Sequence, residues 1–97
     1  MIIGHKQAGV RPALIVSDDL YNHSLAEMVI IVPITSKDKG IPSYVELVCD
    51  FLTEKSFIKT EDICSISTNR LIKRLGRADN ETIKFVEERI KMLLGFI

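Results

Sequence analysis

The stretch Gly4–Ser17, GHKQAGVRPALIVS, joins a polar segment directly to an apolar one. Two glycines, Gly4 and Gly9, bracket the polar segment, and this composition predicts a loop in which positive φ or a close backbone approach is available. The proline that follows Arg11 favours extended geometry at the arginine. The sequence therefore predicts that Arg11 lies at the start of a strand formed by Ala13–Val16.

A second apolar run, Met28–Ile34, is rich in β-branched residues and predicts a central strand with apolar side chains on both faces. It stops abruptly at the polar residues Thr35, Ser36 and Lys37. The sequence thus predicts an arginine at the start of one strand and a threonine at the end of another.

These segments carry a family resemblance. The pattern GHxQxGxRP at residues 4–12, PITS at 33–36 and the closing LLGFI at 93–97 resemble the MazF/PemK family of toxin endoribonucleases from bacterial toxin–antitoxin pairs. The resemblance covers nearly the whole chain. It implies a β-rich α+β fold, a small SH3-like barrel with a C-terminal helix, that forms a dimer and cleaves single-stranded RNA.

The resemblance matches Arg11 and Thr35 to the family's catalytic arginine and threonine. A guanidinium offers a planar fork of five donors to phosphate oxygens, and a hydroxyl bridges to the same group. The structural alternatives are an ion-paired arginine at a strand end and a threonine hydroxyl that satisfies a turn. We favour the functional interpretation because both residues lie inside matching motifs.

Glu61 is a third catalytic candidate, since some branches of the family carry a working carboxylate at the matching position. Burial can tune a carboxylate toward neutrality and fit it for proton transfer. Arginine stays protonated throughout the physiological pH range, so it suits an electrostatic clamp better than a proton shuttle. Whether Arg11 or Glu61 transfers the protons stays open at this point.

Two segments flank the predicted centre, the loops at residues 4–10 and 36–42. Unstacked bases of single-stranded RNA expose edges that such loops can read. The candidate RNA-binding residues are Gln7, Ser17, Ser36, Lys37 and Asp62.

The chemistry expected from the resemblance is metal-free RNA cleavage that leaves a 2′,3′-cyclic phosphate and a 5′-hydroxyl. No cofactor is expected. The partners that the resemblance implies are single-stranded RNA, a cognate MazE/PemI-like antitoxin and a second copy of the chain. The alternative function is a non-catalytic SH3-like binding module or an inactive, truncated toxin homologue, with a gyrase poison as a less favoured variant.

Composition sets limits on these interpretations. The 97 residues predict one domain, 1–97, and the formal net charge of zero argues against an indiscriminate polyanion binder. We find neither a signal peptide nor an apolar run long enough to span a membrane, so we expect the cytoplasm. Cys49 and Cys64 lie in apolar contexts without metal-ligand spacing and are expected to be reduced, buried thiols.

Two departures from the family pattern stand out. The first family strand is expected to be absent, because the chain starts three residues before the polar segment. Many relatives read acid-Gln-x-Arg where this chain reads Glu61, Asp62, Ile63 and Cys64. Base preference is therefore expected to differ from relatives that keep the glutamine and arginine.

The second half of the chain predicts more strands and two helices. A strand is expected at residues 43–48, and a strand, a polar step and another strand from residue 56. Ser67 is expected to cap a short helix through residues 69–75, and Asp79 a final helix that ends at Gly95. The final helix has one apolar stripe, formed by Ile83, Val86, Ile90 and Leu93.

Overall fold

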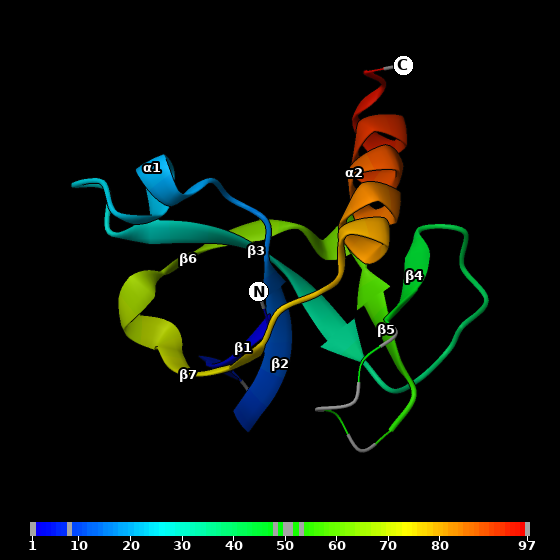
Figure 1. Cartoon of the computed structure of the whole chain (residues 1–97), viewed down its shortest axis with the longest axis horizontal. Coiled ribbons are helices and arrows are strands. Elements are labelled where there is room, and N and C mark those ends of the chain that lie inside the picture. Colours follow the sequence, from blue (N-terminus) through cyan, green and yellow to red (C-terminus); the bar gives the residue numbers. More distant parts are fainter. Residues whose placement is uncertain (1, 8, 48, 50–51, 53, 97) are drawn as a thin grey trace.

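A computed structural model describes residues 2–7, 9–47, 49, 52 and 54–96 (Figure 1). The predicted β-rich fold with a C-terminal helix is confirmed. In chain order the elements are β1 (Ile2–Gln7), β2 (Gly9–Ile15), α1 (Asp19–Asn22), β3 (Met28–Thr35), β4 (Tyr44–Leu47), β5 (Ser56–Lys59), η1 (Thr60–Asp62), β6 (Cys64–Ser67), η2 (Thr68–Arg70), β7 (Leu71–Gly76) and α2 (Asn80–Leu94).

Strand β3 is the centre of the sheet. Neighbouring strands follow the order β4-β5-β3-β2-β1-β7, and β6 also pairs with β3. The first half of β3 pairs with β6, whereas its last two residues, Ile34 and Thr35, pair with β5. All of these pairs are antiparallel. One strand therefore joins the two halves of a small, open, barrel-like sheet, with β4 and β5 beneath α2 in Figure 1.

The start of the chain corrects an expectation. The polar segment predicted to be a loop is strand β1, which pairs with β2 from Ile2 opposite Leu14 to Gln7 opposite Gly9. The other edge of β1 pairs with β7. The backbone donors and acceptors of β2 on this side need partners, and the first residues of the chain supply them. The structure thus has a strand ahead of β2, where we expected the first family strand to be absent.

Residue alternation along β2 divides the core in two. Leu14 packs with Val32, Ile58 and other residues under α2, whereas Ala13 packs in a smaller cluster around Ile31. Successive side chains of a strand point to opposite faces, and β2 and β3 therefore contribute buried residues to both clusters. Burial of a large aliphatic side chain contributes about 1.5–3 kcal/mol, so these two clusters hold the strands in place.

Helix α2 has the predicted ends. The side chain of Asp79 accepts a hydrogen bond from the backbone N–H of Thr82 at 2.8 Å, and Gly95 adopts a left-handed conformation with φ of 74°. The apolar stripe is only partly buried, because Val86 lies in the core and Leu93 is 50% exposed. The helix lies against β4 and η1, and its last turn extends beyond them (Figure 1).

Two further expectations are wrong. Ser67 does cap a turn, since its side chain accepts from the backbone N–H of Asn69, but the turn is only η2 and residues 71–76 form strand β7. Pairing with β1 outweighs the local helical preference of this segment. Cys64 is exposed at the start of β6, because only Ile66 of that strand reaches the core. In the part of the chain that the structure describes, no helix is long and apolar enough to cross a membrane.

Candidate functional site

The pairing of β2 with β3 brings the predicted arginine and threonine together. Ala13 lies opposite Pro33, and the ladder continues through Ile15 opposite Ile31. Extending this register by two residues in the other direction places Arg11 opposite Thr35. Because side chains alternate with a period of two, both positions share one face of the sheet.

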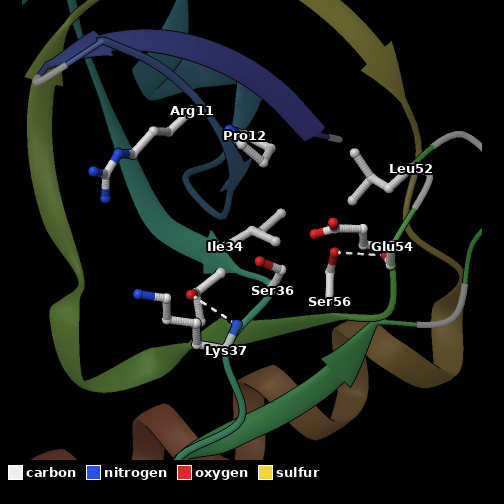
Figure 2. Close-up of a pocket in the computed structure, with 9 residues that line it drawn as sticks. Arg11, Pro12, Ile34, Ser36, Lys37, Leu52, Glu54 and Ser56 are labelled. Atoms are coloured by element: carbon white, nitrogen blue, oxygen red, sulfur yellow. Dashed lines mark hydrogen bonds between the residues drawn. The ribbon is translucent and has the colours of Figure 1, made fainter.

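A cleft of about 420 Å³ lies at this end of the two strands. Figure 2 shows its lining residues, with the side chains of Arg11 and Lys37 at one end. Four predicted site residues, two catalytic and two RNA-binding, line this one cleft. The full lining is Arg11, Pro12, Ile34, Thr35, Ser36, Lys37, Leu52, Glu54 and Ser56.

Thr35 satisfies a turn and still has a hydrogen bond to give. Its Oγ1 accepts a hydrogen bond from the backbone N–H of Lys37 at 3.2 Å. A hydroxyl that accepts one hydrogen bond retains its own proton as a donor. The Thr35 hydroxyl therefore stabilises a turn, as the structural alternative predicted, and can still donate a hydrogen bond to a phosphate oxygen.

Arg11 is exposed on β2, and no ion pair holds it among the described residues. Its guanidinium points to the same end of the cleft as the Lys37 ammonium (Figure 2). Two cationic groups at one end of a cleft favour an anionic ligand, and the planar fork of arginine fits two phosphate oxygens.

Three lining residues belong to none of the motifs that the sequence analysis singled out, namely Leu52, Glu54 and Ser56. They belong to the segment that leads into β5, and Ser56 Oγ donates to the backbone carbonyl of Glu54 at 3.0 Å. Only the pairing of β5 with the end of β3 brings this segment to the cleft. The expected strand from residue 56 was a partial signal for Ser56, but Leu52 and Glu54 had none.

Glu61 and Asp62 lie in η1, outside the lining of this cleft. Glu61 Oε1 accepts a hydrogen bond from Ser43 Oγ at 2.7 Å. Asp62 Oδ2 lies 2.8 Å from Lys59 Nζ, and this hydrogen bond raises the pKa of Lys59. The catalytic role of Glu61 and the RNA-binding role of Asp62 stay predictions.

Ser43 also links η1 to the loop at residues 36–42. Its backbone carbonyl accepts from the buried Thr60 Oγ1 at 2.6 Å, and the neighbouring carbonyl of Pro42 accepts from Arg89 Nε at 3.0 Å. The loop that starts beside Thr35 is thus anchored at its far end by η1 and α2. Sequence reasoning missed this anchor, because the residues come from separate parts of the chain.

The remaining two candidates lie elsewhere. Ser17 follows β2 at its other end, where its hydroxyl donates to the side chain of Asn22 and accepts from the backbone N–H of Ile30 at 3.0 Å. It lines a second cleft of about 600 Å³, together with Arg74 and Arg77. Gln7 ends β1 opposite Gly9, so its backbone lies at the hairpin end that also begins β2.

Metal ligation has no candidate group in the described residues, where no three or more His, Cys, Asp or Glu side chains lie together in a suitable arrangement. The chemistry that the cleft itself offers is that of a guanidinium, an ammonium, hydroxyls and one carboxylate.

Comparison with known proteins places the chain among toxins. Residues 2–94 match the family described as PemK-like, MazF-like toxin of type II toxin–antitoxin system. Endoribonuclease EndoA of Bacillus subtilis (strain 168) is 28% identical over 100 residues, which cover 99% of this chain and 85% of the relative.

Solved structures agree in fold. The Mycobacterium tuberculosis toxin MazF-mt6 superposes with a TM-score of 0.88 at 20% identity, covering 97% of this chain and 95% of that one. A MazE-MazF structure from Deinococcus radiodurans gives a TM-score of 0.85 at 25% identity, covering 97% and 90%.

Proposed function

The chain belongs to the PemK-like, MazF-like toxin family of type II toxin–antitoxin systems, and from that premise we propose that it is an endoribonuclease that cleaves single-stranded RNA. The observation that carries the proposal is the common cleft of Arg11 and Thr35. The similarity to a relative named an endoribonuclease supports the same activity.

The proposed reaction is an intramolecular transphosphorylation. The ribose 2′-oxygen attacks the adjacent phosphorus, the new P–O2′ bond forms, and the P–O5′ bond breaks. The 2′-hydroxyl loses its proton, and the departing 5′-oxygen gains one. The products are a 2′,3′-cyclic phosphate and a 5′-hydroxyl, and the balance needs neither a metal ion nor a cofactor.

Four residues of the cleft have a part in this scheme. The phosphorane transition state gains negative charge on its non-bridging oxygens, and donors aimed at those oxygens lower the barrier. Arg11 supplies a two-pronged clamp, and the Thr35 hydroxyl donates to the same phosphate. In this scheme Lys37 and Ser36 hold the flanking nucleotide, and Gln7 is a further candidate for RNA contact, because its pairing with Gly9 is at the end of the hairpin that leads into Arg11.

Glu61 enters the proposal as an acid–base candidate, although it lies in η1, outside the lining of the cleft. Its side chain is exposed, and the hydrogen bond that it accepts from Ser43 Oγ ties it to the end of the loop at residues 36–42. A role in catalysis requires that the loop brings bound RNA to Glu61.

A cleavage assay in EDTA tests the proposed function. Wild-type protein is expected to cut a mixed-sequence single-stranded RNA in EDTA and to leave 5′-hydroxyl ends, which a polynucleotide kinase labels directly, and 2′,3′-cyclic phosphate ends, which acid opens to phosphomonoesters. Equal cleavage by wild type and Arg11→Ala would overturn the assignment. An inert but folded wild-type protein would favour a non-catalytic binding module.

We also propose a cognate antitoxin and a homodimer. One relative was solved as an endoribonuclease in complex with its cognate antitoxin, from a mycobacterial species. Light scattering on the purified chain is expected to give twice the mass of 11.0 kDa. A monomeric mass at micromolar concentration would contradict the dimer.

A further inference from the structure

The charges of the Arg11 cleft are segregated. Figure 2 shows the Arg11 guanidinium and the Lys37 ammonium at one end and the Glu54 carboxylate at the other, directed toward the interior beside Ser36 and Ser56. Glu54 is the one carboxylate in the lining that the structure describes. No ion pair neutralises it among the described residues.

A carboxylate in a cleft for RNA needs a donor as its partner. It repels phosphate, because both groups are negatively charged, and it accepts hydrogen bonds without donating any. The phosphate therefore belongs at the cationic end. The group that meets Glu54 must carry N–H or O–H donors, which in a nucleotide means the base edge or a ribose hydroxyl.

The space between the two ends suits a base. Its apolar lining consists of Pro12, Ile34 and Leu52, on which a flat ring can rest. The volume of about 420 Å³ lies within the roughly 300–1,000 Å³ of pockets that hold small ligands. A nucleotide with its phosphate at Arg11 therefore presents the edge of its base to Glu54.

We propose that Glu54 is a specificity-determining residue that selects guanine next to the scissile phosphate. This inference rests on the proposed ribonuclease function. The Watson–Crick edge of guanine has two adjacent donors, N1–H and the N2 amine, which match the two oxygens of a carboxylate. Adenine and cytosine offer one amine beside an acceptor, and uracil offers one N–H between two carbonyls, which a carboxylate repels. Single-stranded RNA leaves these edges free.

The isosteric change Glu54→Gln gives the sharpest test. It replaces two acceptors by an acceptor and a donor, which can pair with an adjacent donor and acceptor on the edge of any of the four bases, so the match that is specific to guanine is lost. Glu54 is exposed, and the hydrogen bond from Ser56 goes to its backbone carbonyl, so the fold is expected to survive. Glu88→Gln, on the exposed side of α2, is the matched control.

The measurement is the sequence profile of cuts in an RNA library randomised at the two positions that flank the cut. We expect wild type and Glu88→Gln to prefer guanine over uracil at one of these positions by about tenfold or more. Glu54→Gln is expected to lose most of that preference and to gain adenine or uracil. Identical profiles for wild type and Glu54→Gln would overturn the inference.

Two outcomes separate this inference from neighbouring ones. If Glu54→Gln slows cleavage equally at all bases and its pH–rate profile loses one limb, Glu54 is a proton-transfer group. That result would overturn the inference that Glu54 selects the base. If wild type cuts no RNA, the proposed function fails instead. Binding of oligonucleotides with a 2′-deoxyribose at the central position, which lacks the attacking hydroxyl, then still tests whether guanine is preferred and whether Glu54→Gln abolishes the preference.

Discussion

Arg11 on β2 and Thr35 on β3 occupy opposite positions in the continued register of two antiparallel strands and line one cleft. This arrangement does not depend on a flexible loop, because Arg11 and Thr35 are themselves residues of the paired strands β2 and β3. A rigid scaffold of this kind keeps two donors at a constant spacing, which electrostatic stabilisation of a phosphorane requires.

The first prediction concerns the guanidinium fork. Arg11→Ala is expected to lower the cleavage rate by about 10²–10³-fold, because donors to the transition-state oxygens are lost. Arg11→Lys keeps the charge but not the two-pronged geometry, so it is expected to remain well below wild type. Arg74→Ala, which removes an exposed arginine of β7, is the control, and a loss as large as that of Arg11→Ala would argue for a general charge effect.

The second prediction concerns the Thr35 hydroxyl. Thr35→Ser is expected to retain most of the cleavage activity, because it keeps both the proton donor and the acceptor for the Lys37 N–H. Thr35→Val removes both and is expected to lose most of the activity. Circular dichroism checks the fold of each variant, and activity of Thr35→Val close to that of wild type would remove Thr35 from the mechanism.

A third prediction separates two roles of Glu61. Its carboxylate accepts from Ser43 Oγ, so we expect part of its effect to come from anchoring the loop. Ser43→Ala then lowers cleavage to a similar extent as Glu61→Gln, with an unchanged pH profile. A much larger loss in Glu61→Gln, together with the loss of one limb of the pH profile, would instead identify Glu61 as the proton-transfer group.

A fourth prediction addresses the buried anchor. Thr60 is fully buried, and its hydroxyl donates to the carbonyl of Ser43. Thr60→Val keeps the shape but leaves that carbonyl without this donor, so the free energy of unfolding is expected to fall by about 1–3 kcal/mol. Urea denaturation measures the change, and Thr68→Val, at an exposed hydrogen bond, is the control with a smaller expected effect.

A fifth prediction concerns pH and the cap of α2. Two hydrogen bonds to the Asp79 carboxylate hold its pKa below the usual value of 3.8. The larger effect comes from the side chain of Thr82 and the smaller one from the backbone N–H of Thr82. A depressed pKa gives stability that is present above 3.8 and is lost as the pH falls through the lower value of the folded state. Asp79→Ala is therefore expected to have a lower Tm than wild type at pH 7, and the difference narrows below about pH 4. A constant difference from pH 7 to pH 2 would contradict this account.

Particular residues show how far sequence reasoning reached. Arg11 and Thr35 were predicted from motifs on two predicted strands, and the cap residues Asp79 and Gly95 from local hydrogen-bonding rules. These signals are local or lie in one contiguous motif. Glu54 was missed because it belongs to a segment between strands, where neither periodicity nor capping marks a residue.

Errors in the fold have the same origin. The polar start of the chain has the composition of a loop, and residues 69–75 were expected to form a short helix. Instead, residues 2–7 form β1 and residues 71–76 form β7, and these two strands pair with each other. Strand pairing between residues about 70 positions apart satisfies backbone groups that no local rule takes into account.

The amino-acid sequence by itself determined the family likeness, the central strands and the two residues proposed to hold the phosphate, because apolar runs, turn residues and caps act over short distances. Only the tertiary structure decided that Glu54 faces these residues across a cleft and that Glu61 bonds to Ser43 outside it. The physical reason is that sheet register and loop anchoring are set by contacts between segments that are distant in the sequence. The residue pattern of one segment alone does not determine the free energy of such contacts.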